Sequence, residues 1–203
     1  MQKPREISAP VQVIVEGLDT EKFIEVFLRD LKLDNIQLQN YGGNHEMRIF
    51  LAALRNAPEF KERVQSLGII RDAEADATAA FQSVCDVLEH VNLDRPVRPE
   101  QFVGNQPRVG IFLFPDGSRA GMLETLCLEA IGNDPVIECV IEYFDCVKRK
   151  VGALPNNLEK ARLRTFLASR PRPHLQLARA IDAGYIPCNS SCFDGIKNFL
   201  RSL

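Results

Sequence analysis

Four short runs of strand-forming residues, each followed by a segment with helical periodicity, constrain the fold of this chain more than any other feature. The runs cover residues 11–15, 36–40, 67–70 and 109–114, and three of them are rich in valine, isoleucine or leucine. Such runs favour buried strands. Strand–helix alternation over four rounds requires parallel crossovers, because each helix carries the chain back across the sheet. We therefore predict an α/β fold with a mostly parallel four-stranded sheet and helices on both faces.

The pattern changes after Pro135, where the strand signal stops. Helical periodicity then continues through residues 136–150, 157–169, 175–183 and 192–203. In the first part, helices are expected over 19–31, 45–56, 75–91 and 121–131, and residues 92–107 are expected to form a loop. We therefore divide the chain into an α/β core over residues 1–134 and a helical C-terminal extension over residues 135–203, packed on the same domain.

Composition excludes several classes of protein. Hydrophobic residues make up 45% of the 203 residues and charged residues 26%, which is ordinary for a globular protein. No apolar run approaches the roughly 20 residues that span a bilayer, so no membrane partner is expected. The first residues lack the apolar core of a secretory signal. We expect a cytoplasmic protein whose six cysteines are reduced thiols.

Acidic residues gather at the ends of the predicted strands. One ends the first strand, three follow the third, one follows the fourth and one opens the next helix: Glu16; Asp72, Glu74 and Asp76; Asp116; and Glu124. In an open parallel sheet, ligands bind outside the carboxyl ends of the strands. If the first and third strands are neighbours, Glu16 and Asp72 project towards the same edge.

Several carboxylates at one edge repel one another, so they must take up protons, be strongly solvated or hold a cation. Mg²⁺ or Mn²⁺ is the natural guest, because both prefer hard oxygen ligands. A metal held in this way can orient a phosphodiester and activate a water. Acids at strand ends are also common as helix caps and surface groups, and position alone does not separate these interpretations.

The same residues carry a resemblance to a known family. Val13-Ile-Val-Glu16-Gly17, followed by Gly68-Ile-Ile-Arg-Asp72-Ala-Glu74-Ala-Asp76, resembles the Toprim domain of topoisomerases, primases and OLD-family nucleases. Small stand-alone Toprim-like proteins of bacteria and archaea look most similar, and their later segment is echoed by Phe114-Pro-Asp116-Gly and Glu124. The likeness covers roughly residues 11–131 and implies a Toprim-like, Rossmann-like sheet.

The resemblance also implies roles for the acids. Glu16 matches the general acid/base or metal-binding Glu of the family, and Asp72 matches its first metal-binding Asp. Glu74 stands where the family has a second Asp, and Asp76 lies where it can compensate. Glu124 resembles the acid that supplies a second metal site in OLD-type nucleases, and Asp116 would complete the site. Whether one or two ions bind, and whether Glu74 permits catalysis, stays open.

Three further residues are candidates for contacting phosphate. Arg71 and Arg119 lie beside the acids and can meet a phosphate or neutralise the carboxylates. Gly43 lies in the turn Tyr41-Gly-Gly-Asn-His45, whose backbone N–H groups can face a phosphate at a helix start. A glycine turn capped by Asn44 explains the same residues.

Charge is distributed unevenly along the chain. Residues up to Phe144 contain 14 lysines and arginines against 23 acids, and residues from Asp145 on contain 11 against 4. A basic segment is compatible with a phosphate-bearing partner, but it is equally compatible with attraction between the two parts of the chain.

Two functions remain for this chain. The first is Mg²⁺-dependent, nuclease-like phosphoryl transfer on nucleic acid or nucleotide. The second is a non-catalytic Toprim-fold binding or adaptor module, for example in defence against foreign DNA. The sequence has no GxxxxGK[ST] phosphate loop, no recognisable topoisomerase tyrosine and no primase zinc module. It leaves the substrate, the oligomeric state and the pathway open.

Overall fold

The computed structural model of this chain describes residues 2–43 and 46–203. Contacts divide the chain into two compact units, Met1–Met122 with Gly195–Leu203 and Leu123–Asp194. The first unit contains β1 (Val11–Val15), α1 (Gly17–Leu31), β2 (Ile36–Asn40), α2 (Met47–Arg55), α3 (Pro58–Arg63), β3 (Ser66–Asp72), α4 (Ala77–His90), β4 (Phe102–Val103), β5 (Arg108–Phe114) and most of α9 (Asp194–Ser202). The second contains α5 (Leu123–Ala130), α6 (Val136–Val151), α7 (Leu158–Ala168), α8 (Leu177–Asp182) and the short 3₁₀ helix η2 (Ser191–Phe193).

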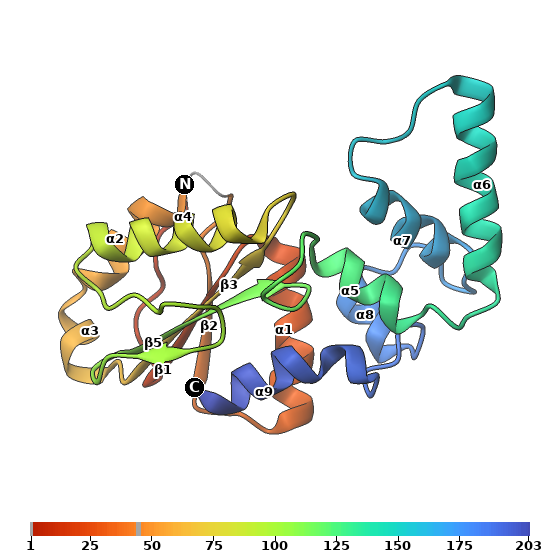
Figure 1. Cartoon of the computed structure of the whole chain (residues 1–203). Helices are drawn as coiled ribbons and strands as arrows, with labels where there is room; N and C mark the ends of the chain where they lie inside the picture. Colours follow the sequence, from red (N-terminus) through yellow and green to blue (C-terminus); the bar gives the residue numbers. More distant parts are fainter. Residues whose placement is uncertain (1, 44–45) are drawn as a thin grey trace. The chain divides into compact units, whose positions relative to one another are not determined.

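The sheet has the order β2-β1-β3-β5-β4 (Figure 1). β1 pairs in parallel with β2 and β3, and β3 pairs in parallel with β5, which confirms the predicted Rossmann-like α/β fold. β4 adds a fifth strand, antiparallel to β5. It lies within the segment expected to be a loop, since two residues are too few for a periodic signal. The neighbouring positions of β1 and β3 are those that the site prediction assumed.

Helices α2, α3 and α4 cover one face of the sheet. Alternate strand residues such as Ile14, Ile69 and Ile111 point to this face and share a core with Met47, Phe50 and Leu54 of α2 and with Val84 and Leu88 of α4. All residues of β1 are buried, because its two faces are both covered. Helix α3 was not predicted, since its six residues bury only Phe60 and carry no periodic signal.

Aromatic residues dominate the other face, which α1 and α9 cover. Phe23 of α1 packs edge-on against Phe114 at 6.0 Å between ring centroids, and Phe199 of α9 stacks on Phe102 at 5.3 Å. Phe199 also lies 5.5 Å from Phe112. A Cβ at Gly68 would lie 3.0 Å from Leu203 and 3.3 Å from Phe199, so glycine lets the C-terminal residues approach the sheet closely.

The last helix explains why the observed division of the chain differs from the predicted one. The boundary falls after Met122 rather than after residue 134, and residues 195–203 return to the first unit. Periodicity showed that residues 192–203 are helical, but it does not show which core their apolar face joins. Here Phe199 and Leu200 join the sheet.

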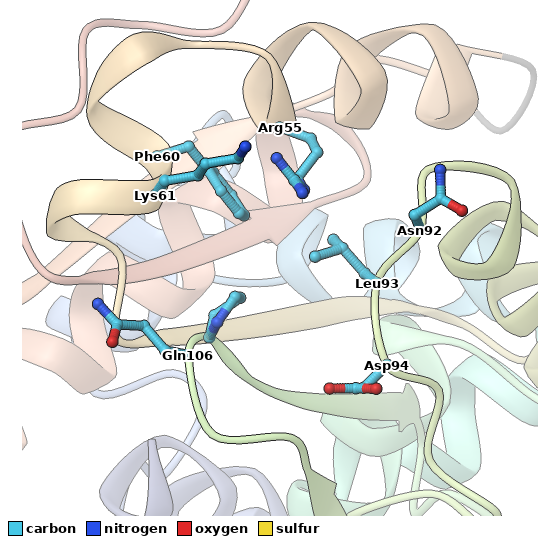
Figure 2. A pocket seen from close by; sticks show the side chains of 8 residues that line it. Arg55, Phe60, Lys61, Asn92, Leu93, Asp94 and Gln106 are labelled. Carbon is cyan, nitrogen blue, oxygen red and sulfur yellow. The ribbon is translucent and has the colours of Figure 1, made fainter.

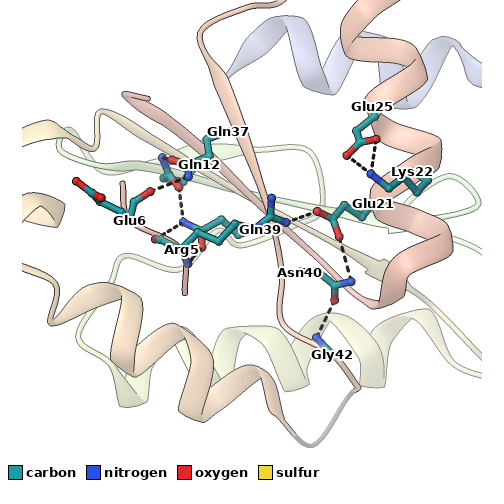
Figure 3. A network of polar contacts seen from close by, with 10 residues as sticks. All are labelled: Arg5, Glu6, Gln12, Glu21, Lys22, Glu25, Gln37, Gln39, Asn40 and Gly42. Atoms are coloured by element: carbon teal, nitrogen blue, oxygen red, sulfur yellow. Dashed lines mark hydrogen bonds and ion pairs between the residues drawn. The ribbon is translucent and has the colours of Figure 1, made fainter. Parts of the chain in front are cut away.

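Polar contacts tie the N-terminal segment to β2 (Figure 3). The Gln39 side chain accepts from the backbone N–H of Arg5 at 2.8 Å and donates to buried Gln12 at 2.8 Å. Gln37 accepts from Gln12 at 2.9 Å and donates to the carbonyl of Glu6 at 2.8 Å. These bonds satisfy the buried amides of β1 and β2 and cover an edge strand.

The second unit is helical and contains its own core. α7 contacts both α5 and α6, and the buried side chains include Leu126, Val140, Phe144 and Phe166. Arg170 lies 4.0 Å over the Phe166 ring and pairs with Asp134 at 2.8 Å. The hydrogen bond from Arg170 lowers the pKa of Asp134 below its usual value. Part of the predicted basic segment is therefore paired within this unit.

Among the helices formed by residues 2–43 and 46–203, none combines the length and the apolar character that a membrane crossing requires.

The packing of α9 predicts a large loss of stability for Phe199→Ala. Removing a buried ring that contacts two others should lower the free energy of unfolding by about 3–5 kcal/mol. Urea unfolding of the variant measures this loss, and Asn198→Ala on the exposed side of α9 is the matched control, with an expected change within about 0.5 kcal/mol. Equal stability of the two variants would contradict the packing of α9 on the sheet.

Candidate functional site

The carboxyl edge of the sheet brings together the ends of three neighbouring strands. Glu16 follows β1 directly, Asp72 is the last residue of β3, and Asp116 follows β5 after one residue. Both Glu16 and Asp72 are half-buried. The edge therefore presents acids from consecutive strands, as parallel pairing requires.

Glu16, Tyr41 and Arg71 lie at the same level on one face of the sheet. Val15 pairs with Asn40 on one side and with Ile70 on the other, so the next residues along the three strands are neighbours. The Tyr41 hydroxyl donates to Oε2 of Glu16 at 3.3 Å. Because side chains alternate along a strand, Asp72 points to the opposite side of β3 from Arg71.

Burial and the charges of three nearby residues act on the Tyr41 phenol. Its ring is fully buried in the core beneath α2, and burial raises the pKa of its phenol well above the ordinary value. The negative charge of Glu16 raises this pKa further, that of Asp72 adds a smaller increase, and the positive charge of Arg71 opposes both. Glu16 and Asp72 thus lie within electrostatic range of one phenol, which remains a neutral donor towards Glu16.

Arg71 is a buried residue, and its side chain is only 3% exposed. Its Nε donates to the backbone carbonyl of Asp72 at 3.3 Å, and its Nη1 is buried without a hydrogen-bond partner among the described residues. A buried guanidinium keeps its charge. Arg71 therefore supplies fixed positive charge behind the edge and is not an exposed arm for phosphate.

The turn after β2 positions Tyr41. Asn40 donates to buried Glu21 of α1 at 3.3 Å and accepts from the backbone N–H of Gly42 at 2.8 Å (Figure 3). Glu21 is held in turn by an ion pair with Arg5. Gly42 has a φ of 90°, and a Cβ there would collide with the Glu46 carboxylate.

The predicted phosphate-contacting turn is only partly described. Gly43 is exposed, and its carbonyl accepts from the N–H of Glu46 at 2.9 Å. Asn44 and His45, the proposed cap and its neighbour, lie outside the described residues.

Glu74 and Asp76 follow β3 but have different surroundings. Glu74 is exposed, has a φ of 58° and forms a two-bond bridge with Gly121, at 2.8 and 2.7 Å. The Asp76 side chain accepts from the N–H of Ala79 at 3.0 Å and so caps α4. The cap occupies one oxygen of Asp76, as expected if acids at strand ends serve as N-caps of the following helices.

Asp116 is engaged within its own loop. Its Oδ1 accepts from the N–H groups of Ser118 and Arg119, both at 3.0 Å, and its Oδ2 pairs with the Arg119 guanidinium. Partial burial raises the pKa of Asp116, but the bonds from Arg119 and Ser118 outweigh burial and lower this pKa to about 2. Burial raises the pKa of the neighbouring Glu100, and the charge of Asp116 raises it further.

Glu124 belongs to the second unit, where it is the second residue of α5. It is nearly buried and pairs with Lys160 of α7 at 3.3 Å.

The structure thus places Glu16 and Arg71 beside Tyr41 on one face of the sheet, and it leaves Asp72 at the same edge with its side chain on the other face of β3. Asp76, Asp116 and Glu124 have other partners. Within the described part of the chain, no three acids, cysteines or histidines lie close enough together to form a metal cage. Tyr41, Asn40 and Glu21 were missed in the sequence. The sequence offers a signal for two of them, since Asn40 ends a predicted strand and Tyr41 follows it directly, but none for Glu21 within α1.

The comparisons with known proteins give a family and structures of similar fold. A family described as "Protein of unknown function (DUF3226)" matches residues 10–203. The chain belongs to this family. No curated protein matches its sequence.

Among solved structures, the chain is similar to the C-terminal region of the Burkholderia pseudomallei OLD protein, with a TM-score of 0.52 and 15% identity over 97% of this chain and 98% of that one. A C-terminal region of the Xanthomonas campestris pv. campestris OLD protein gives a TM-score of 0.45 and 14% identity, covering 96% and 95%. The Burkholderia match confirms the predicted link to OLD proteins as a shared fold.

The loop around Asp116 generates a prediction for acid titration. The pKa of Asp116, measured by NMR of its carboxyl carbon, should be about 2, and Arg119→Gln should raise it towards 3.8. Since the folded pKa lies below the unfolded one, ionised Asp116 stabilises the fold fully above pH 3.8, and this contribution disappears as the pH falls through about 2. The variant should therefore lose less stability across that range. A wild-type pKa near 3.8 would rule out the ion pair of Asp116 with Arg119 and its hydrogen bonds within the loop.

Proposed function

We propose that this chain is a Toprim-like domain that performs divalent-metal-dependent, nuclease-like phosphoryl transfer on nucleic acid or nucleotide. The observation that carries the proposal is that Glu16 and Asp72 lie at the carboxyl ends of the adjacent parallel strands β1 and β3, with Glu16 accepting a hydrogen bond from the buried phenol of Tyr41. The resemblance of the Glu16 and Asp72 segments to Toprim motifs supports it, and so does the fold shared with the C-terminal region of an OLD protein.

The oxygen donors at this edge fit one kind of metal binding. Two carboxylates, with Glu74 exposed two residues beyond Asp72, do not enclose a cation by themselves. Mg²⁺ and Mn²⁺ are commonly held by one or two carboxylates together with water and substrate phosphate. The edge therefore suits an ion whose coordination the substrate completes, and not one held by protein side chains alone.

Each residue of the edge has a role in this proposal. A bound Mg²⁺ or Mn²⁺ would polarise the phosphoryl oxygens and make a bound water more acidic. Glu16 would serve as acid/base or as a metal ligand, with the neutral Tyr41 hydroxyl fixing one of its oxygens. Asp72 and Glu74 would supply the remaining oxygens. Arg71 would offset part of the negative charge from its buried position, without contacting the substrate.

Three predicted site residues take a smaller part. Asp76 keeps one oxygen free of its cap bond to Ala79, so it can support water around an ion. The Asp116–Arg119 pair would have to open before either residue meets substrate. Glu124 pairs with Lys160 within its own unit.

A binding module without turnover is the second candidate, and the engagement of Asp116 with Arg119 favours it. A site with two carboxylates can retain a metal and a phosphate-bearing ligand without the second ion that many nucleases use.

Glu16→Gln and Asp72→Asn should each reduce Mn²⁺-dependent cleavage of DNA, RNA or nucleotides by about 100-fold or more, since an acid/base group or a ligand is lost. Product formation by the purified chain measures this effect. Glu25→Gln on α1 and Asp86→Asn on α4 are matched exposed controls that should retain full activity.

Calorimetric titration with Mn²⁺ provides a readout independent of turnover. Wild type should bind the ion more tightly when a nucleotide is present, and both site variants should bind it at least about tenfold more weakly. Metal-dependent ligand binding without any cleavage would select the binding module. Absence of Mn²⁺ binding at millimolar concentration would refute both candidates.

A further inference from the structure

A cavity of about 400 Å³ lies at the amino end of the sheet, at the other end of the strands from Glu16 and Asp72 (Figure 2). Arg55, Phe60 and Lys61 form one wall, from the end of α2 and from α3. The other walls come from residues 92–94, which follow α4, and from residues 106–107, which precede β5. All of these residues belong to the first unit.

Arg55 is the feature of this cavity that points to a ligand. Its Nε is buried and has no hydrogen-bond partner among the described residues. Its guanidinium carbon lies 5.6 Å from the centroid of the buried Phe60 ring, which holds the planar group in place. Figure 2 shows the guanidinium directed into the cavity, with the Lys61 ammonium on the same wall. A positioned guanidinium that lacks an acceptor is suited to a planar or tetrahedral oxyanion.

The charges around the cavity favour a negative ligand. Arg55 and Lys61 lie on one wall, and Asp94 is the acid among the lining residues. The Asp94 carboxylate lies against Gly104, where it would obstruct any side chain. A smaller adjoining cavity of about 200 Å³ shares Arg55 and Asn92. Positive charge thus predominates beside the unpaired guanidinium.

We propose that this cavity binds a small organic molecule through a phosphate or carboxylate group. Arg55 holds the oxyanion, Lys61 adds a second positive charge, and the amides of Asn92 and Gln106 bond to the polar remainder of the ligand. The volume lies within the range of small-molecule sites. This site is independent of the proposed phosphoryl transfer, because it shares no residue with the carboxyl edge.

Calorimetric titration of the full chain, in buffer depleted of divalent metals with a chelating resin, tests the proposal. The probes are inorganic phosphate, adenosine monophosphate and citrate, which separate a phosphate group from a carboxylate group. At least one probe should bind with one-to-one stoichiometry and a Kd of about 1 mM or lower. Arg55→Gln should weaken this binding about tenfold, and Lys61→Gln at an exposed position should weaken it about threefold.

Arg48→Gln is the matched control, because Arg48 is exposed on the same helix and does not line the cavity. It should bind the probe like wild type, and so should Glu16→Gln, which separates this site from the proposed function. Thermal unfolding of each variant verifies folding, and Lys61→Gln still tests the site if Arg55→Gln is unstable. The proposal is overturned if none of the probes binds at about 10 mM, or if neither cavity variant weakens binding.

Discussion

Parallel pairing of β1 with both β2 and β3 is the constraint on which the rest of the site depends. The register aligns Val15 with Asn40 and with Ile70, so the next residue of each strand emerges at one level. Glu16, Tyr41 and Arg71 therefore become neighbours although 55 residues of sequence separate the first from the last. A shift of one residue in either pairing would turn Tyr41 or Arg71 to the opposite face and separate the phenol from Glu16.

The four parallel strands follow from the sequence because buried parallel strands leave a direct apolar signal, whereas their order, including the adjacency of β1 and β3, comes from the structure. The sequence predicts the site residues less completely than the strands, since a carboxylate that caps a helix has the same sequence context as one that binds a metal. Asp76 lies three residues before the N–H of Ala79, which is the spacing of a helix cap. Asp116 lies in a turn with Ser118 and Arg119, and all three groups satisfy one another locally. No pattern in the chain distinguishes these residues from Glu16.

Long-range contacts set the features that the sequence does not show. Asn40 shapes the turn at Gly42 only because Glu21, on a different element, accepts its amide, and Glu21 is held by Arg5. Arg71 seemed suited to an exposed role beside the acids, but β3 is central in the sheet and covered on both faces, so the residue is buried. Helix α9 likewise joins the sheet through the contact of Phe199 with Phe112, 87 positions earlier in the chain.

The burial of Arg71 changes the electrostatic argument for a metal. Two carboxylates at one edge would demand a cation if nothing else balanced them, but a fixed guanidinium next to them already offsets about one charge. The excess negative charge at the edge is then smaller, so a divalent ion alone is attracted less strongly. A substrate phosphate adds the negative charge and the oxygen ligands that the ion lacks. Metal and phosphate should therefore bind this edge together, with each raising the affinity of the other, because thermodynamic coupling between two ligands is reciprocal.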